Sequence, residues 1–297
     1  VKAAAIALPP DATVEDAFRT VVRAALAQVA ANASGALDSL DLEYVHQMRV
    51  GMRRFRSSLI AFRSAMPRET GARIRLGLRD AGRALGTTRD WDVLSQRIAA
   101  AGRTRFPERA SLEALKRRVL LRRTASVRRT RRAIDAVDLA GALRRAERWL
   151  ERAPWRGNVP ADVLGSPVAP LARRALKRLR RKALECGEDV AALPGDARHQ
   201  FRVRIKRLRY ACEFFAALYP HRRARKFIRR LQQLQDTLGE LNDIAVARRL
   251  LGDTAALPAR AKRAITRLHQ RDARRERQLL IELDAKWKIL KAADPFW

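Results

Sequence analysis

An internal repeat constrains the fold of this chain more than any other feature. Sliding the sequence by 153 residues brings the segment that begins at His46 onto the segment that begins at His199. The register then holds without a gap as far as the pair Val93 and Val246, and 13 of the 48 aligned pairs are identical. We interpret the two halves as copies of one unit. A repeat of this kind predicts two equivalent units that meet side by side.

Each unit is predicted to be helical. Long Ala-, Leu-, Arg- and Glu-rich segments carry apolar residues at helical spacing, and the alternation typical of strands is almost absent. Amphipathic helices joined by short Pro- or Gly-marked turns pack as antiparallel bundles, so the fold class is all-α. The predicted divisions are an extended N-terminal segment at 1–11, a first bundle at 12–153, a Pro- and Gly-rich linker at 154–170 and a second bundle at 171–297.

The charge balance points to a polyanionic partner. The 297 residues include 64 Lys and Arg against 31 Asp and Glu, which gives a formal net charge of +33. Arg accounts for 54 of the 64 cations, and its planar guanidinium suits multidentate contact with phosphate oxygens. A polyanion would relieve the self-repulsion of such a chain and release counterions. Charge alone is compatible with nucleic acid as well as with other linear polyanions.

The repeated segments each carry a basic stripe on one helix face. Basic residues recur three, four and three positions apart, and apolar residues such as Met52 and Phe55 occupy the opposite face. Ten residue steps cover about 15 Å of helix, a length suited to a linear anion. Like charges at these spacings destabilise an isolated helix by roughly 0.2–0.5 kcal/mol per pair, so their recurrence favours ligand binding over a solvated face or a face neutralised by internal carboxylates. The first stripe is His46, Arg49, Arg53 and Arg56, the second stripe is His199, Arg202, Lys206 and Arg209, and Arg54 and Arg207 are predicted to supplement them.

A second shared element pairs a glycine with an aspartate. Gly86 and Gly239 resemble the glycine that ends a helix, with a new helix starting just after each of them. Asp90 and Asp243 then lie near a predicted helix start. Their role is either structural or to hold arginines such as Arg54 and Arg207 in fixed rotamers, as a preorganised anion site requires.

Other functional classes find little support. The cysteines Cys186 and Cys212 form no metal-binding pattern with the four histidines, no acidic cluster accompanies either stripe, and no nucleophile stands beside the histidines. We therefore predict no cofactor, no metal and no enzymatic activity, although phosphoanhydride hydrolysis is a third possibility. No signal peptide or spanning segment is recognisable, which predicts a cytoplasmic protein, and the start at Val1 suggests the downstream part of a longer protein.

The paired motifs resemble the CHAD domain, the conserved histidine alpha-helical domain, over about residues 12–292. The resemblance implies two four-helix bundles around a basic central cavity that binds inorganic polyphosphate, often in proteins found at polyphosphate granules. Family members are often fused behind a CYTH domain, whose Glu-x-Glu-x-Lys signature this chain lacks. The resemblance rests on three segments, Val45–Arg56, Arg198–Tyr210 and Leu234–Asp243.

Together these observations predict a non-catalytic polyphosphate-binding module whose two stripes contact phosphate oxygens. A nucleic-acid-binding helical protein is the alternative, disfavoured by the scarcity of aromatic residues among the basic patches. The histidines either bind phosphate or are structural. The basic segment from Arg117 to Arg132 is either solvated surface or an auxiliary anion contact, and Gly51, where the second copy has Arg204, makes the two stripes unequal.

Overall fold

The computed structural model describes residues 1–38, 42–67, 69–103, 109–135, 138–252 and 258–297. Within these ranges the chain forms α-helices and two short 3-10 helices but no β-strand. The β-type pairing in these ranges is one isolated bridge between Thr13 and Pro167. The predicted all-α class is confirmed. None of the described helices combines the length and the apolar character that crossing a bilayer requires. The elements are α1 (Val14–Ala30), α2 (Ala33–Asp38), α3 (Leu42–Ala61), α4 (Ala72–Arg103), α5 (Arg109–Asp135), α6 (Leu139–Arg152), η1 (Pro154–Gly157), α7 (Ala161–Gly165), α8 (Val168–Leu184), α9 (Gly195–Phe215), η2 (Ala216–Leu218), α10 (His221–Leu251) and α11 (Ala259–Lys291).

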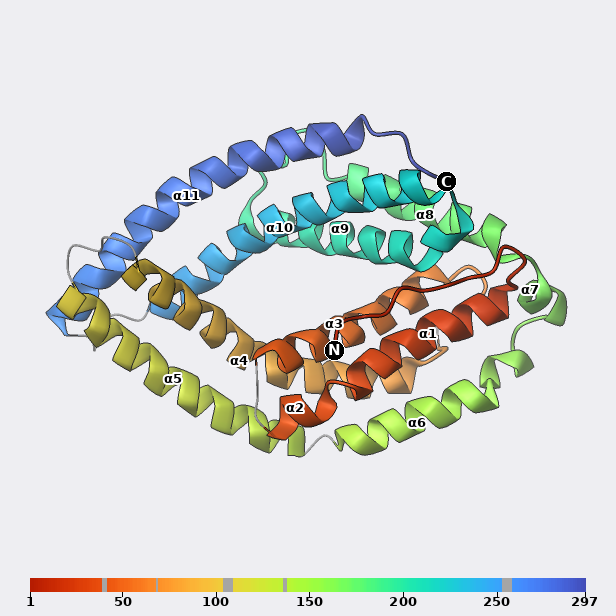
Figure 1. Ribbon diagram of the computed structural model, residues 1–297, viewed down its shortest axis with the longest axis horizontal. Helices are drawn as coiled ribbons and strands as arrows, with labels where there is room; N and C mark the ends of the chain where they lie inside the picture. The colour runs from red at the N-terminus through yellow and green to blue at the C-terminus, as the bar shows by residue number, and fades with distance from the viewer. Residues whose placement is uncertain (39–41, 68, 104–108, 136–137, 253–257) are drawn as a thin grey trace.

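The helices of the two halves lie on opposite sides of the molecule (Figure 1). Helices α1 to α6 form one side and α8 to α11 the other. The stripe-bearing helices α3 and α9 pack against each other near the middle of the chain's fold, while α5 contacts α11 and α4 contacts α10 toward one end. The equivalent segments of the repeat therefore face one another.

Apolar side chains gather in two separate cores. The larger core joins the halves, and in it Phe62 of the first copy and its repeat equivalent Phe215 lie with ring centroids 5.4 Å apart. The smaller core is formed where α4 and α5 meet α10 and α11. It contains Leu94 and Leu112 from the first half and Leu251 and Leu268 from the second. Polar residues of α3, α4, α9 and α10 lie between these two cores.

The predicted helix breaks at Gly86 and Gly239 are wrong, because α4 and α10 continue through both positions. A glycine that ends a helix adopts a positive φ, and the described glycines with positive φ are Gly71 and Gly187. Gly86 instead makes room for a neighbour: a Cβ there would lie 3.0 Å from Nη1 of Arg49. A Cβ at Gly239 would meet no atom within 4 Å. Both glycines keep helix surface free of side chains beside the stripes.

The segments predicted to be extended or to form a linker are packed onto the larger core. Ile6 and Leu8 of the N-terminal segment are buried, and so are Trp155 and Leu164 between the halves. The segment 154–170 contains η1 and α7. The division of the chain into two bundles at this segment stays a prediction.

Candidate anion-binding site

The stripes are oriented by the apolar faces of their helices. Met48 and Phe55 of α3 and Phe201 and Ile205 of α9 are fully buried in the larger core. Residues three or four positions away on an α-helix share a face, so burying these side chains turns the basic positions in another direction. The amphipathic pattern thereby directs both stripes away from the core.

Both stripes open onto one cavity of about 730 Å³. Helices α4 and α10 supply its remaining wall, including the cation of Arg89. Seven of the ten predicted phosphate-binding residues line this single space: His46, Arg49, Arg53, His199, Arg202, Lys206 and Arg209.

The other three predicted residues lie elsewhere. Arg54 is 5% exposed and donates a 2.8 Å hydrogen bond to Glu213 of α9, with its guanidinium 5.3 Å from the centre of the Phe214 ring. Arg56 lies in a separate groove between α3 and α4. Arg207 lines a small pocket of about 110 Å³ between α3, α8 and α9, together with Arg178 and other cations. Arg54 is thus paired with a carboxylate inside the fold, whereas Arg56 lines the groove between α3 and α4 and Arg207 lines the small pocket.

Crowded cations disfavour their own charged states in this cavity. Burial, followed by the charges of Arg202, Arg53 and Arg209, lowers the pKa of Lys206 to about 6. Burial, followed by the charge of Arg53, lowers the pKa of Arg49 to about 10. Burial also lowers the pKa of His46, with Arg89 as the next cause. Each of these shifts is the response expected of a cation that is removed from water and has other cations as neighbours.

Carboxylates also line the cavity, a feature that inspection of the stripes alone missed. Asp90 accepts a 3.1 Å hydrogen bond from Arg249, and its charge acts on Arg49. Asp243 acts in the same way on Arg202, the repeat equivalent of Arg49. Of the two roles considered for these aspartates, holding arginines is the one seen here, but the arginines are Arg49 and Arg202, whereas Arg54 pairs with Glu213. The cavity carboxylates are Asp90, Asp236, Glu240 and Asp243.

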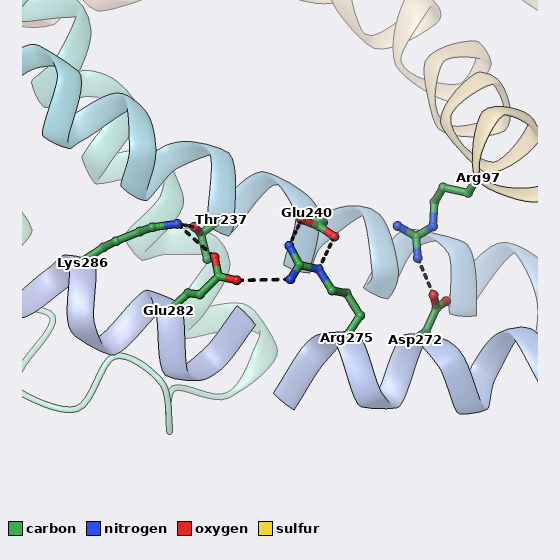
Figure 2. A network of polar contacts seen from close by, with 7 residues as sticks. All are labelled: Arg97, Thr237, Glu240, Asp272, Arg275, Glu282 and Lys286. Atoms are coloured by element: carbon green, nitrogen blue, oxygen red, sulfur yellow. Dashed lines mark hydrogen bonds and ion pairs between the residues drawn. The ribbon is translucent and has the colours of Figure 1, made fainter. Parts of the chain in front are cut away.

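Glu240 is tied to a network outside the cavity. Arg275 of α11 donates to both of its carboxylate oxygens, at 2.8 and 2.9 Å, and these bonds lower the pKa of Glu240 (Figure 2). Arg275 also contacts Glu282, which accepts from Lys286 at 3.0 Å. Alongside them, Arg97 of α4 pairs with Asp272 of α11. The network neutralises the charge of Glu240 and joins α10 to α11.

Several polar side chains fix the arginines of the second stripe. Arg202 Nη1 donates to Oδ1 of Asn242 at 3.2 Å, while its buried Nε has no acceptor among the described residues. Arg209 donates from Nε to Gln235 at 2.8 Å and lies 4.7 Å from the ring centre of Tyr210. Tyr210 is 2% exposed and contributes to the cavity wall. Arg89 and Gln235 were missed because neither is shared between the copies.

The basic segment Arg117 to Arg132 lies on α5, outside the cavity lining. Within it, Arg123 donates a 2.6 Å bond to the buried Asp92 of α4, and Arg128 and Arg129 are exposed. No three His, Cys, Asp or Glu side chains of the described ranges group as metal ligands would. Several cavity arginines, among them Arg202 and Arg209, are instead held by individual hydrogen-bond partners.

Comparison with known proteins identifies the family of this fold. The family model of the CHAD domain matches residues 20–252. The crystal structure of the CHAD domain from the plant Ricinus communis superposes with a TM-score of 0.78 and 28% identity, over 99% of this chain and 97% of that chain. PptA from Streptomyces chartreusis gives a TM-score of 0.68 at 17% identity, over 93% of this chain and 100% of that chain, and shares the fold. Comparison with curated protein sequences finds no match.

Proposed function

The chain belongs to the CHAD domain family, and we propose that its cavity binds inorganic polyphosphate without catalysing its turnover. The observation that carries this proposal is the convergence of both stripes on one cavity. Phosphate oxygens would supply the negative charge that the cations of the cavity lack, and several contacts along one polymer would add their affinities. The family's association with polyphosphate selects this polymer among linear polyanions.

In this proposal the two halves act as pseudo-symmetric four-helix bundles around the basic cavity. Arg49 and Arg53 on one side, and Arg202 and Lys206 on the other, contact phosphate oxygens directly. Arg209 and Arg89 extend this contact surface, and the two stripe histidines border it. Asp90 and Asp243 serve as positioning residues that hold Arg49 and Arg202 by charge.

Nucleic acid is the competing ligand. Proteins that bind single strands without sequence preference stack the bases on accessible aromatic rings. Tyr210 is the one Phe, Tyr or Trp among the described residues that line the cavity, and it is buried. Polyphosphate needs no such platform, and so the wall chemistry favours it. We further propose a cytoplasmic location at polyphosphate granules, in some settings beside a CYTH-type domain.

A competition titration tests the proposal directly. Long-chain polyphosphate should displace a fluorescent polyphosphate from the protein at lower phosphate concentration than single-stranded DNA or RNA does. Equal or better displacement by nucleic acid would favour the alternative. Incubation with polyphosphate and Mg²⁺ should leave the polymer length unchanged on a gel, and phosphate release that a stripe substitution abolishes would contradict the non-catalytic assignment.

Variants test whether the stripes form one site. The double variants Arg49→Ala/Arg53→Ala and Arg202→Ala/Lys206→Ala should each weaken long-chain binding about tenfold, since each removes two charge contacts. Arg128→Ala/Arg129→Ala, on the exposed face of α5, removes the same charge away from the cavity and should bind like the parent. Circular dichroism checks that the helices persist. If one stripe variant binds like the parent while the other does not bind, the site belongs to a single copy.

A further inference from the structure

A second opening, between α3 and α4, adjoins the cavity. This groove has a volume of about 280 Å³ and shares Arg49 and Arg53 with the cavity wall. Because the same two side chains border both spaces, an anion held by them can continue from one into the other. The groove is lined by Arg49, Met52, Arg53, Arg56, Leu78, Arg79, Gly82 and Arg83.

The charge of the groove is only partly compensated. Its lining contains five arginines and no carboxylate. Among the described residues neither Arg56 nor Arg83 has an acidic partner, and Arg79 pairs with the exposed Asp80 alone. Partial burial, followed by the charges of Arg75 and the arginines of the groove, lowers the pKa of Arg56. The cluster resembles an anion site more closely than the cavity does, since the cavity carries four carboxylates.

The second copy of the repeat has different residues at the positions equivalent to this groove. The equivalent of Arg56 is Arg209, whose guanidinium is occupied by Gln235 and by Glu213. Gln235 stands where the first copy has Gly82, and its side chain accepts the 2.8 Å hydrogen bond from Arg209. The positions equivalent to Arg75, Arg79 and Arg83 are held by Ile228, Gln232 and Asp236.

The small residue at Gly82 belongs to the construction of the groove. A Cβ at this position would lie 3.3 Å from Sδ of Met52, already a tight contact. A longer side chain would occupy the space between Arg56 and Arg83. The first copy therefore combines a glycine with three additional cations, and the second copy combines a larger residue with neutral or acidic residues.

We propose that the groove lined by Arg56, Arg79 and Arg83 is a second polyphosphate-binding segment, which receives the polymer where it leaves the cavity on the side of the first copy. This proposal rests on the proposed function of the cavity. It makes the bound polymer asymmetric, with an extended contact on one copy and none on the other. Short oligophosphates, which the cavity accommodates alone, do not reach the groove.

The test uses the double variant Arg79→Gln/Arg83→Gln, which gives the groove side chains closer to those of the second copy. Long-chain polyphosphate should bind about tenfold more weakly than to the parent, and the slope of log affinity against log salt should become shallower by about 1.4, for two lost contacts. Tripolyphosphate should bind with unchanged affinity. The matched control Arg128→Gln/Arg129→Gln removes the same charge from α5 and should leave both ligands unaffected.

The outcomes separate the groove from the cavity. If the groove variant binds long chains with the affinity and salt slope of the parent, the proposed role of the groove is wrong. The proposed role of the cavity would be unaffected. Equal weakening of tripolyphosphate and long chains would also overturn it, because the two arginines would then act inside the cavity. If the parent protein binds neither ligand, both the proposed function of the cavity and the proposed role of the groove are wrong.

Discussion

Arg54 of α3 and Glu213 of α9 form a 2.8 Å ion pair that links the two copies of the repeat. The guanidinium is almost fully buried, and Glu213 also accepts from Arg209 of the second stripe. One carboxylate thus holds a structural arginine and an arginine of the cavity wall. The relationship explains why Arg54, although it follows Arg53 in the sequence, does not line the cavity.

Removing this carboxylate should destabilise the fold. Glu213→Ala leaves the buried charge of Arg54 without its partner, a change that costs about 3–5 kcal/mol when both groups are buried. Glu213 keeps 23% of its side chain exposed, so we expect a loss just below that range, about 2–3 kcal/mol, in urea unfolding. The double variant Arg54→Met/Glu213→Met removes both charges and should recover most of the loss. A double variant no more stable than Glu213→Ala would show that the pair itself is not the source of the stability.

Lys206 should couple polyphosphate binding to proton uptake. Its pKa of about 6 leaves the amine neutral in the free protein at about pH 7.5, and a bound phosphate favours the ammonium form. The complex therefore binds more protons, and affinity should fall as the pH rises above about 6, by up to about tenfold per pH unit for one proton. Titration calorimetry in buffers of different ionisation enthalpy measures the proton count directly.

The variant Lys206→Met provides the control for this proton uptake. It should bind more weakly at about pH 6 and show less proton uptake than the parent at about pH 7.5, because the amine that gains the proton is gone. The pKa of Lys206 is about 6 in the folded protein and about 10 in the unfolded chain. Between these values the folded parent binds fewer protons than the unfolded chain, so the free energy of unfolding of the parent should rise with pH from about 6 to about 10. Proton uptake that persists unchanged in Lys206→Met would assign it to another group.

The two equivalent glycines should respond differently to alanine. Gly239→Ala should stabilise α10 by about 0.5–1 kcal/mol, because alanine is the better helix former and the new Cβ meets no atom. Gly86→Ala gains the same propensity but forces Nη1 of Arg49 to move, so its stability gain should be smaller and its affinity for polyphosphate lower. Urea unfolding and ligand titration of both variants check this pair of effects. Unchanged affinity in Gly86→Ala would mean that the position of Arg49 does not matter for binding.

Salt should weaken binding steeply. Six side-chain cations of Arg and Lys line the cavity, and at about 0.7 released counterions per contact they give a log–log slope of about −4. Contacts with the groove would steepen this value for long chains, toward about −6 with three more arginines. Affinity measured between low and moderate salt gives the slope. A value near −1 would show that the cations do not act together.

The sequence predicted the helical class and the shared cavity lining because both follow from local periodicity and from the repeat. His46, Arg49 and Arg53 share a helix face whatever surrounds them, and their repeat equivalents must do the same. The resemblance of the motifs to the CHAD domain is confirmed by the family match. The assignment of all ten site residues to phosphate contact stays a prediction.

Other features depend on contacts that a stripe pattern cannot reveal. Arg54 is one position from Arg53, but its ion pair with Glu213 holds its side chain inside the fold. The equivalent of Glu213 in the first copy is Ile60, so the repeat does not reveal this pair. Gly86 has the sequence context of a helix end, yet α4 continues through it. The absence of a side chain at Gly86 instead leaves room for the guanidinium of Arg49 on α3. Both cases reflect tertiary contacts that override local signals.

The presence of residues from both copies in each apolar core has a consequence for cooperativity. Neither copy can unfold alone without exposing the partner's share of both cores, including the ring of Phe215 and the side chain of Leu268. A duplicated chain with independent cores would melt in two steps, whereas interlocked cores tie the copies into one transition. Calorimetry of the chain should therefore show a single heat-absorption peak, and a fragment containing one copy should not fold as a monomer.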